Sequence, residues 1–286
     1  MLLSSWISAR YSTSSYIIRF AFSQISTKLF MTVLLTLAIQ SLDRLLSEGG
    51  QEMFEVPRLA AESLDLRGVM IDASHLSGWS LESYDKFRNN ADKSKSPCLL
   101  IRDNTKLDIL ADTEIALERI KRLSVAANRL GCNAIAITPF FPKDQEQVDT
   151  IVEHIRGAMQ GVERLELNLL LQPCDGLSSD PDVLVEVIKQ IGGFRIGALP
   201  TFQYAGLTGD GIEALRKLAP YAGGIVADFP CGRGKTKVDP VEGLKAVLEV
   251  GYSNTIALNY SGTGDALKQI KKVVRQMRAY LESDSK

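Results

Sequence analysis

Eight short apolar segments alternate with longer amphipathic segments along this chain. Each apolar segment is a nearly continuous run of hydrophobic residues, and most of them end in a polar residue. This pattern is typical of parallel strands that are covered on both faces, because neither face meets water. The expected strands lie at 32–38, 68–72, 98–102, 134–138, 167–172, 197–202, 224–229 and 255–259.

The segments between these strands have the features of helices. The longest runs from about Thr113 to Leu130 with apolar residues on one face, and Gly131 stands where the helix should end. Asp180-Pro181 and Asp239-Pro240 are typical helix starts, since aspartate caps a helix and proline fits its first turn. Further helices are expected over 41–47, 54–64, 81–91, 145–160, 211–218 and 266–281.

Eight strand–helix units predict a single (β/α)8 TIM barrel over residues 31–286, because this order in about 250 residues is typical of that fold. A doubly wound open sheet is the alternative. That fold usually carries a glycine-rich phosphate turn after its first strand, and Ile39-Gln40-Ser41-Leu42 is not such a turn. We therefore expect one α/β barrel domain.

Residues 1–30 have a different composition from the expected barrel. They are rich in Ser and Tyr, carry basic residues, and the first acidic residue of the chain is Asp43. This is the composition of a transit peptide. The other interpretation, which we favour, is that translation begins at Met31 and that 1–30 belong to an extended gene model, because the first expected strand follows that methionine directly. The apolar run 29–39 is too short to span a bilayer.

Charge and cysteine content narrow the class of protein. The chain has 33 basic and 34 acidic residues and a net charge of −1, which gives no electrostatic reason to expect a nucleic acid or membrane partner. Its four cysteines are far apart and form no CxxC motif or Cys/His zinc pair. We expect reduced thiols and a cytoplasmic location. Assembly into a homo-oligomer stays open.

Polar residues stand at the carboxyl ends of the expected strands, where TIM barrels place their active sites. They are Gln40, Asp72, His75, Arg102, Asp103, Thr138, Gln172, Thr201, Asp228 and Asn259. A divalent cation needs several carboxylate or imidazole ligands at one point, but strands five to eight offer two amides, a hydroxyl and one carboxylate. We therefore predict no metal site and no cofactor. Asp72, His75 and Asp103 form the weaker alternative cluster.

Asp228 is the best candidate for an acid or base, because a carboxyl group at the end of a buried strand should have a raised pKa. The alternative is that Asp228 pairs with Arg233 or Lys235 in the following loop. Catalysis by proton transfer also requires the proton to be returned, so His75 or Asp103 would have to reach the same cavity. These three acidic or imidazole groups are the expected catalytic residues.

A second set of residues is expected to bind the substrate. Arg102 either binds an anion in the barrel mouth, the opening at the carboxyl ends of the strands, or pairs with Asp72 or Asp103. The sequence leaves these alternatives open. Loops seven and eight of TIM barrels often bind phosphate, and the loop after strand seven is cationic and rich in glycine. The expected substrate contacts are Gln172, Thr201, Asn259, Arg102, Arg233 and Lys235.

Several segments in order resemble the xylose isomerase-like TIM barrels, a family of sugar phosphate isomerases and epimerases. The resemblance runs from about Met31 to the carboxyl terminus. Its most specific parts are 117–122 with 130–134, 196–202, 218–222, and 251–252 with 256–260. The resemblance implies a TIM barrel that acts on a sugar or a sugar phosphate.

The same resemblance implies a divalent cation, which family members hold with Glu on strand five, Asp on strand six, His near strand seven and Glu on strand eight. The matching positions here are Gln172, Thr201, about Val226 and Asn259, and each departs from that pattern. Two functions follow. The first is an isomerase or epimerase that works without the usual metal, with Asp228 as base. The second is a pseudoenzyme that binds a sugar, a sugar phosphate or a protein partner.

Overall fold

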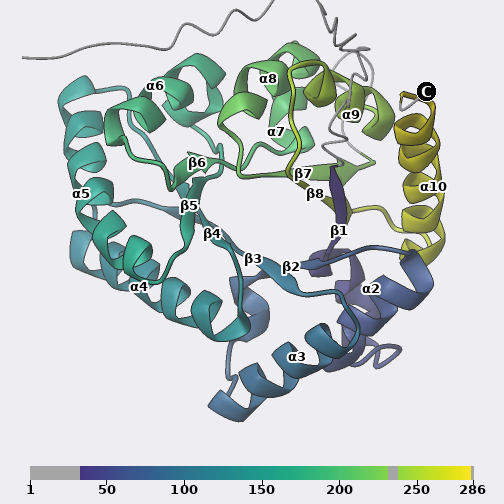
Figure 1. Ribbon diagram of the computed structural model, residues 1–286. Helices are drawn as coiled ribbons and strands as arrows, with labels where there is room; N and C mark the ends of the chain where they lie inside the picture. Colours follow the sequence, from purple (N-terminus) through teal and green to yellow (C-terminus); the bar gives the residue numbers. More distant parts are fainter. Residues whose placement is uncertain (1–32, 231–237, 285–286) are drawn as a thin grey trace, which may run out of the picture. The chain divides into compact units, whose positions relative to one another are not determined.

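The structure is a computed structural model that describes residues 33–230 and 238–284. The expected amino-terminal extension, Arg233 and Lys235 lie outside the described residues. Eight parallel strands stand at the centre and helices surround them (Figure 1). The strands are β1 (Leu34–Ala38), β2 (Val69–Asp72), β3 (Cys98–Leu107), β4 (Ala134–Pro139), β5 (Asn168–Leu171), β6 (Ile196–Ala198), β7 (Gly224–Phe229) and β8 (Thr255–Tyr260).

The helices follow the strands in the predicted alternation. They are α1 (Asp43–Ser47), α2 (Val56–Leu64), α3 (Leu81–Lys93), α4 (Thr113–Leu130), α5 (Gln145–Arg164), α6 (Pro181–Ile191), α7 (Phe202–Leu207), α8 (Gly211–Leu218), α9 (Pro240–Glu249) and α10 (Ala266–Asp284). Asp180 caps α6 and Asp239 caps α9, both through side-chain oxygens that accept backbone N–H hydrogen bonds. Gly131 ends α4 with a positive φ of 75°. These starts and this stop are confirmed.

The sheet runs in the order β6-β5-β4-β3-β2-β1-β8-β7, with parallel pairing throughout. Two isolated bridges, Ala198 to Ala222 and Thr201 to Val226, join the β6 side to the β7 side. Glycine makes this approach possible, because a Cβ on Gly197 would lie 2.7 Å from the carbonyl oxygen of Tyr221. The predicted (β/α)8 TIM barrel is confirmed.

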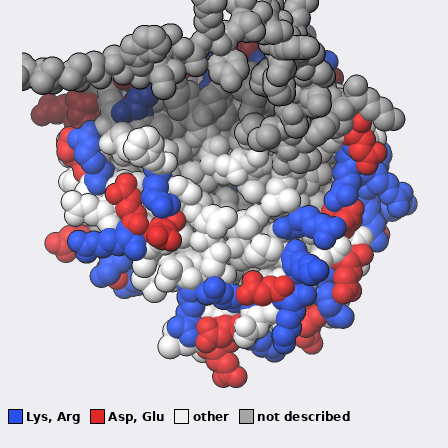
Figure 2. All heavy atoms as spheres, in the orientation of Figure 1, with Lys and Arg blue, Asp and Glu red and all other residues white. Residues whose placement is uncertain are grey.

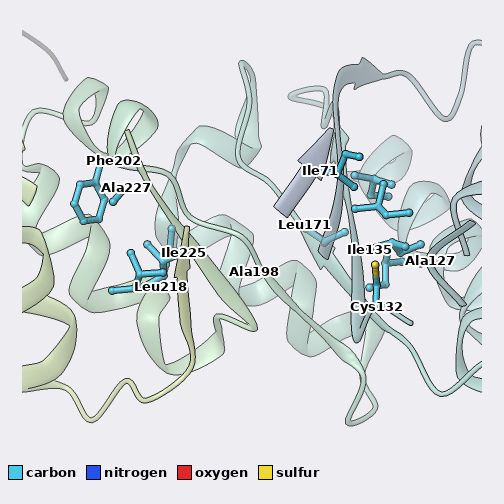
Figure 3. Packing of buried hydrophobic residues seen from close by; sticks show 14 of the residues in the cluster. Ile71, Ala127, Cys132, Ile135, Leu171, Ala198, Phe202, Leu218, Ile225 and Ala227 are labelled. Atoms are coloured by element: carbon cyan, nitrogen blue, oxygen red, sulfur yellow. The ribbon is translucent and has the colours of Figure 1, made fainter. Parts of the chain in front are cut away.

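Alternation along the strands produces two separate apolar layers. Outward residues such as Ile71, Ile135, Leu171, Ile225 and Ala227 pack in the cluster between the strands and the helices (Figure 3). Inward residues fill the barrel itself. They are Ala38, Met70, Leu100, Ala134, Ala136, Leu170, Leu199, Val226 and Ala257.

Strand six is shorter than predicted. The sequence indicated a strand over 197–202, but β6 ends at Ala198 and Thr201 becomes the cap of the short helix α7. The Thr201 hydroxyl accepts a hydrogen bond from the backbone N–H of Tyr204 at 3.1 Å. Proline at position 200 has no N–H to donate to a neighbouring strand, which favours an end to the strand before it. The Thr201 cap then starts a helix instead.

Charges of both signs are interspersed on the outer elements, and uncharged residues dominate the centre of the face shown in Figure 2. This distribution agrees with the net charge of −1. Among the helices that the structure describes, none is both long enough and apolar enough to cross a bilayer.

Candidate active site at the barrel mouth

A ring of polar side chains lies directly above the inward apolar layer. In a strand every second residue points to the same side, so the residue two positions beyond each inward apolar residue also points inward. This rule places in the ring one residue from each strand or from the segment that directly continues it, and all except Gln40 are buried. The ring consists of Gln40, Asp72, Arg102, Thr138, Gln172, Thr201, Asp228 and Asn259.

A cavity of about 250 Å³ opens at this ring. Of the described residues that line it, five are amides, four carry hydroxyls, one is an arginine and one is an aspartate. They are Gln40, Asn104, Gln172, Gln203 and Asn259, then Thr201, Tyr204, Tyr260 and Ser261, with Arg102 and Asp228. The mouth is therefore polar but carries few charges.

Arg102 is held in one orientation. Its Nε donates to Asp72 Oδ1 at 2.7 Å, and its Nη2 donates to Asp72 Oδ2 at 2.9 Å and to Gln40 Oε1 at 2.6 Å. Only 2% of Arg102 is exposed. Such a two-pronged pair fixes the guanidinium plane as well as its position. Of the alternatives that the sequence left open for Arg102, the structure contains the pair with Asp72.

Asp228 is a buried acid with neutral hydrogen-bond donors around it. Asn259 Nδ2 donates to its Oδ1 at 2.7 Å, and the backbone N–H of Gln203 donates to its Oδ2 at 3.1 Å. Burial raises the pKa of Asp228, and the donors from Asn259 and Gln203, the charge of Arg102 and the Thr201 hydroxyl oppose that rise only in part. Asp228 therefore holds a proton more readily than an ordinary aspartate.

Gln172 has an unused hydrogen-bond acceptor. Its Nε2 donates to Asn104 Oδ1 at 2.6 Å, whereas its Oε1 is buried and accepts no hydrogen bond from the described residues. Only 2% of Gln172 is exposed. Leaving a buried acceptor unpaired costs about 1–3 kcal/mol, so a donor on a ligand would be favourable at this point.

The structure brings Asp228, Arg102, Gln172, Thr201 and Asn259 together at the mouth, but it does not bring Asp103 there. Asp103 follows Arg102 directly in β3 and so points to the opposite, outer face. There it pairs with Arg119 of α4, whose Nη2 donates to Asp103 Oδ1 at 2.8 Å.

His75 is also not among the residues that line the cavity. It lies on a short 3-10 turn (Ala73–Leu76) after β2, and its Nε2 is 2.7 Å from Asp43 Oδ1. Burial lowers the pKa of His75, but the hydrogen bond and charge of Asp43, together with the charge and backbone hydrogen bond of Asp72, outweigh burial, so the pKa is raised overall. The convergence of His75 or Asp103 on Asp228, which the sequence analysis required, is absent from this structure.

Three lining residues that sequence reasoning missed have an identifiable signal. Asn104 is two positions beyond Arg102 in β3, so the alternation of the strand would have placed it in the mouth. Gln203 and Tyr204 enter because Thr201 caps α7 and turns the chain across the cavity. The Pro200-Thr201 pair is the signal for such a turn, because proline interrupts a strand and threonine is a common helix cap.

The mouth does not fit the divalent cation that the resemblance implies. Of the four matching positions, Val226 belongs to the apolar layer and the other three carry no charge. The part of the chain that the structure describes contains no group of three His, Cys, Asp or Glu residues able to hold a metal. The Asp72 carboxylate is already occupied by Arg102, whose positive charge would repel a cation.

Comparison with known proteins identifies the fold. No protein-family model and no curated protein matches this sequence. Among solved structures, AsbF of Bacillus anthracis, a probable 3-DHS dehydratase, matches 86% of this chain and 99% of its own with 15% identity and a TM-score of 0.70.

Two further solved structures have the same barrel. A xylose isomerase domain protein of Planctomyces limnophilus covers 88% of this chain and 96% of its own, with 17% identity and a TM-score of 0.66. The 3-keto-D-glucoside 4-epimerase YcjR of E. coli covers 87% and 100%, with 13% identity and a TM-score of 0.69. At these identities the likeness shows the fold alone, a (β/α)8 barrel shared with these enzymes.

Proposed function

We propose that the barrel mouth binds a small sugar-like molecule in a site that does not use a divalent cation. The observation that carries this proposal is the lining of the cavity, in which amides and hydroxyls outnumber charged groups. An amide offers both donors and an acceptor, as a sugar hydroxyl does, so a ring of amides matches a ligand with many hydroxyls.

The size of the cavity supports a single small ligand. At about 250 Å³ it lies just below the range of about 300–1,000 Å³ that is common for small-molecule sites. The name of one solved neighbour, 3-keto-D-glucoside 4-epimerase, gives a sugar derivative as its substrate. A phosphate on the ligand stays an expectation, because Arg233 and Lys235 lie outside the described residues.

Turnover is the function that we favour, and Asp228 is the reason. Its buried carboxyl faces the cavity, and its pKa is raised, as is common for groups that move protons. Binding without turnover is the second candidate, supported by the positions of His75 and Asp103 away from the mouth. We place either activity in the cytoplasm, with a small molecule rather than a nucleic acid or membrane as partner.

Ligand-induced stabilisation tests the proposal. The full chain is treated with EDTA and titrated with neutral sugars and sugar phosphates, followed by thermal unfolding and calorimetry. A ligand at about a hundredfold over its Kd should raise stability by roughly 2.7 kcal/mol. Gln172→Ala should weaken the effect. The matched control Gln276→Ala changes the same residue type on α10, away from the mouth, and should leave the effect intact.

The same titration with Mn²⁺, Mg²⁺, Co²⁺ and Zn²⁺ tests whether the site needs a cation. Stoichiometric binding of any of these cations, with a comparable gain in stability that is lost in Asp228→Asn, would contradict a metal-independent site. Sugar binding that appears only in the presence of such a cation would contradict it as well.

A further inference from the structure

Arg102 and Asp228 lie at the same cavity as a fixed cation and a carboxyl group. We infer that they form a metal-independent pair that removes a proton next to a carbonyl group of the ligand, with Arg102 as donor to the carbonyl oxygen and Asp228 as base. This inference rests on the proposed function. It departs from the mechanism that the resemblance implies, because an arginine takes the place of the cation.

Arg102 has the properties of an electrophilic group. Its bonds to Asp72 and Gln40 use Nε and Nη2 and orient the guanidinium, while Nη1 takes no part in these bonds. Arginine stays charged at every physiological pH. A positive donor that is already oriented before the reaction stabilises a developing oxyanion without reorganisation.

Asp228 has the properties of a base. Asn259 and Gln203 each give one hydrogen bond to a different carboxylate oxygen, which leaves lone pairs on both oxygens. The side chain is buried, with 5% of the residue exposed, and it lines the cavity. Little solvent surrounds the carboxylate there, so it is a stronger base than an exposed aspartate.

Gln172 completes the recognition of the ligand. Its unpaired Oε1 would accept a hydrogen bond from a hydroxyl. The ligand would need a carbonyl oxygen for Arg102, a C–H for Asp228 and a neighbouring hydroxyl for Gln172. A compound with these three groups is an α-hydroxy carbonyl compound. The structure thus indicates the open-chain form of a ketose or aldose as the ligand class.

The chemical step is balanced without a co-reactant. The C–H bond next to the carbonyl breaks, and its proton moves to a carboxylate oxygen of Asp228. The electron pair of that bond forms a C=C bond, and the carbonyl electrons move onto the oxygen to which Arg102 donates. Return of a proton from Asp228 to carbon restores the carbonyl group, so nothing is oxidised or reduced overall.

Asp228 is the one carboxyl group among the described residues that line the cavity. Tyr204 also lines it, but burial raises the pKa of Tyr204, so its phenol stays protonated at neutral pH. Tyr204 is therefore not the base, and we assign both removal and return of the proton to Asp228, which would reach the ligand from one face. In D₂O this path exchanges the carbon-bound proton for deuterium.

Proton exchange measured by NMR tests the inference. The EDTA-treated full chain is incubated with dihydroxyacetone or D-fructose in D₂O, and binding of the same probes is measured by calorimetry. We expect exchange above the uncatalysed rate that EDTA does not change. Asp228→Asn should slow exchange about 100-fold or more while binding changes only a few-fold, because general bases contribute about 10²–10⁴.

Arg102→Lys should lower the exchange rate more than it lowers affinity, because lysine keeps the charge but loses the planar donor group. Asp228→Asn is nearly isosteric, so it keeps the test valid even if Arg102→Lys folds poorly. The control Asp85→Asn makes the same chemical change on α3 outside the barrel and should exchange at the wild-type rate.

The outcomes separate the two proposals. Binding of a probe without exchange would overturn the Arg102–Asp228 inference and leave the proposed function standing. Exchange that EDTA abolishes and a divalent cation restores would also overturn it. Absence of both binding and exchange with every sugar tested would overturn the proposed function together with the inference.

Discussion

Asp228 makes an unusual contribution to stability because its surroundings oppose its ionisation. Burial raises its pKa in the folded protein above the ordinary value of 3.8. Between the unfolded and the folded pKa, the folded state therefore binds more protons than the unfolded state. The stability that Asp228 contributes is complete below about pH 3.8 and is lost as the pH rises through the folded pKa.

Asp228→Asn should remove this loss of stability. We expect the free energy of unfolding of the variant, minus that of the wild type, to rise between about pH 4 and pH 7 in urea denaturation. We also expect a constant penalty of about 1 kcal/mol, because the one acceptor oxygen of asparagine cannot replace both oxygens that accept from Asn259 and Gln203. A difference that falls with pH would contradict the raised pKa.

The buried pair of Arg102 and Asp72 gives a second prediction. Arg102→Met leaves the Asp72 carboxylate buried without its partner, and such a loss costs about 3–5 kcal/mol. The double variant Arg102→Met/Asp72→Leu removes both charges and should recover most of that loss. Urea denaturation of both single variants and the double variant measures the coupling. Additive losses would show that the two side chains do not depend on each other.

The junction of β6 and β7 depends on the absence of side chains. Gly197→Ala would place a Cβ 2.7 Å from the Tyr221 carbonyl oxygen, which is backbone and cannot rotate away. We expect a loss of about 1–3 kcal/mol by thermal unfolding. Gly157→Ala, in α5 with no atom near its added Cβ, is the control and should stabilise by up to about 1 kcal/mol. Equal effects at both positions would contradict the close approach.

The strands show how far sequence reasoning reaches. Continuous apolar runs located the eight strands, and the polar residues at their carboxyl ends predicted Arg102, Gln172, Thr201, Asp228 and Asn259 at the mouth. A list of strand ends alone did not separate inward from outward positions, so Asp103 was included with its neighbour. Alternation within β3 distinguishes the two faces, and it would also have found Asn104.

Other features depend on contacts that no local pattern contains. His75 was expected at the cavity, but its position follows from Asp43, which is 32 residues away in the chain. Gln203 reaches Asp228 only because Thr201 ends the extended segment and caps α7. Arg102 pairs with Asp72 because the register of β2 against β3 places these two residues side by side.

Backbone pairing between neighbouring strands is not equally extensive all around the barrel. Most neighbouring strands share continuous ladders, whereas the β6 and β7 sides are joined by two isolated bridges. Gly223 N donates to Ala198 O at 3.1 Å and Val226 N donates to Pro200 O at 3.0 Å. A junction with few backbone hydrogen bonds opens at lower free energy than a full ladder, so it should be the first part of the barrel to open.

Amide hydrogen exchange tests this junction and the site together. We expect the amides of Gly223 and Val226 to exchange faster than those at the β1–β8 ladder. A ligand in the mouth would contact Thr201 on one side of the junction and Asp228 and Asn259 on the other, and so would hold the two sides together. A saturating sugar should therefore slow these amides by a factor near 1 + [L]/Kd. Protection confined to other parts of the chain would place the ligand elsewhere, because a molecule that bridges β6 and β7 must oppose their separation.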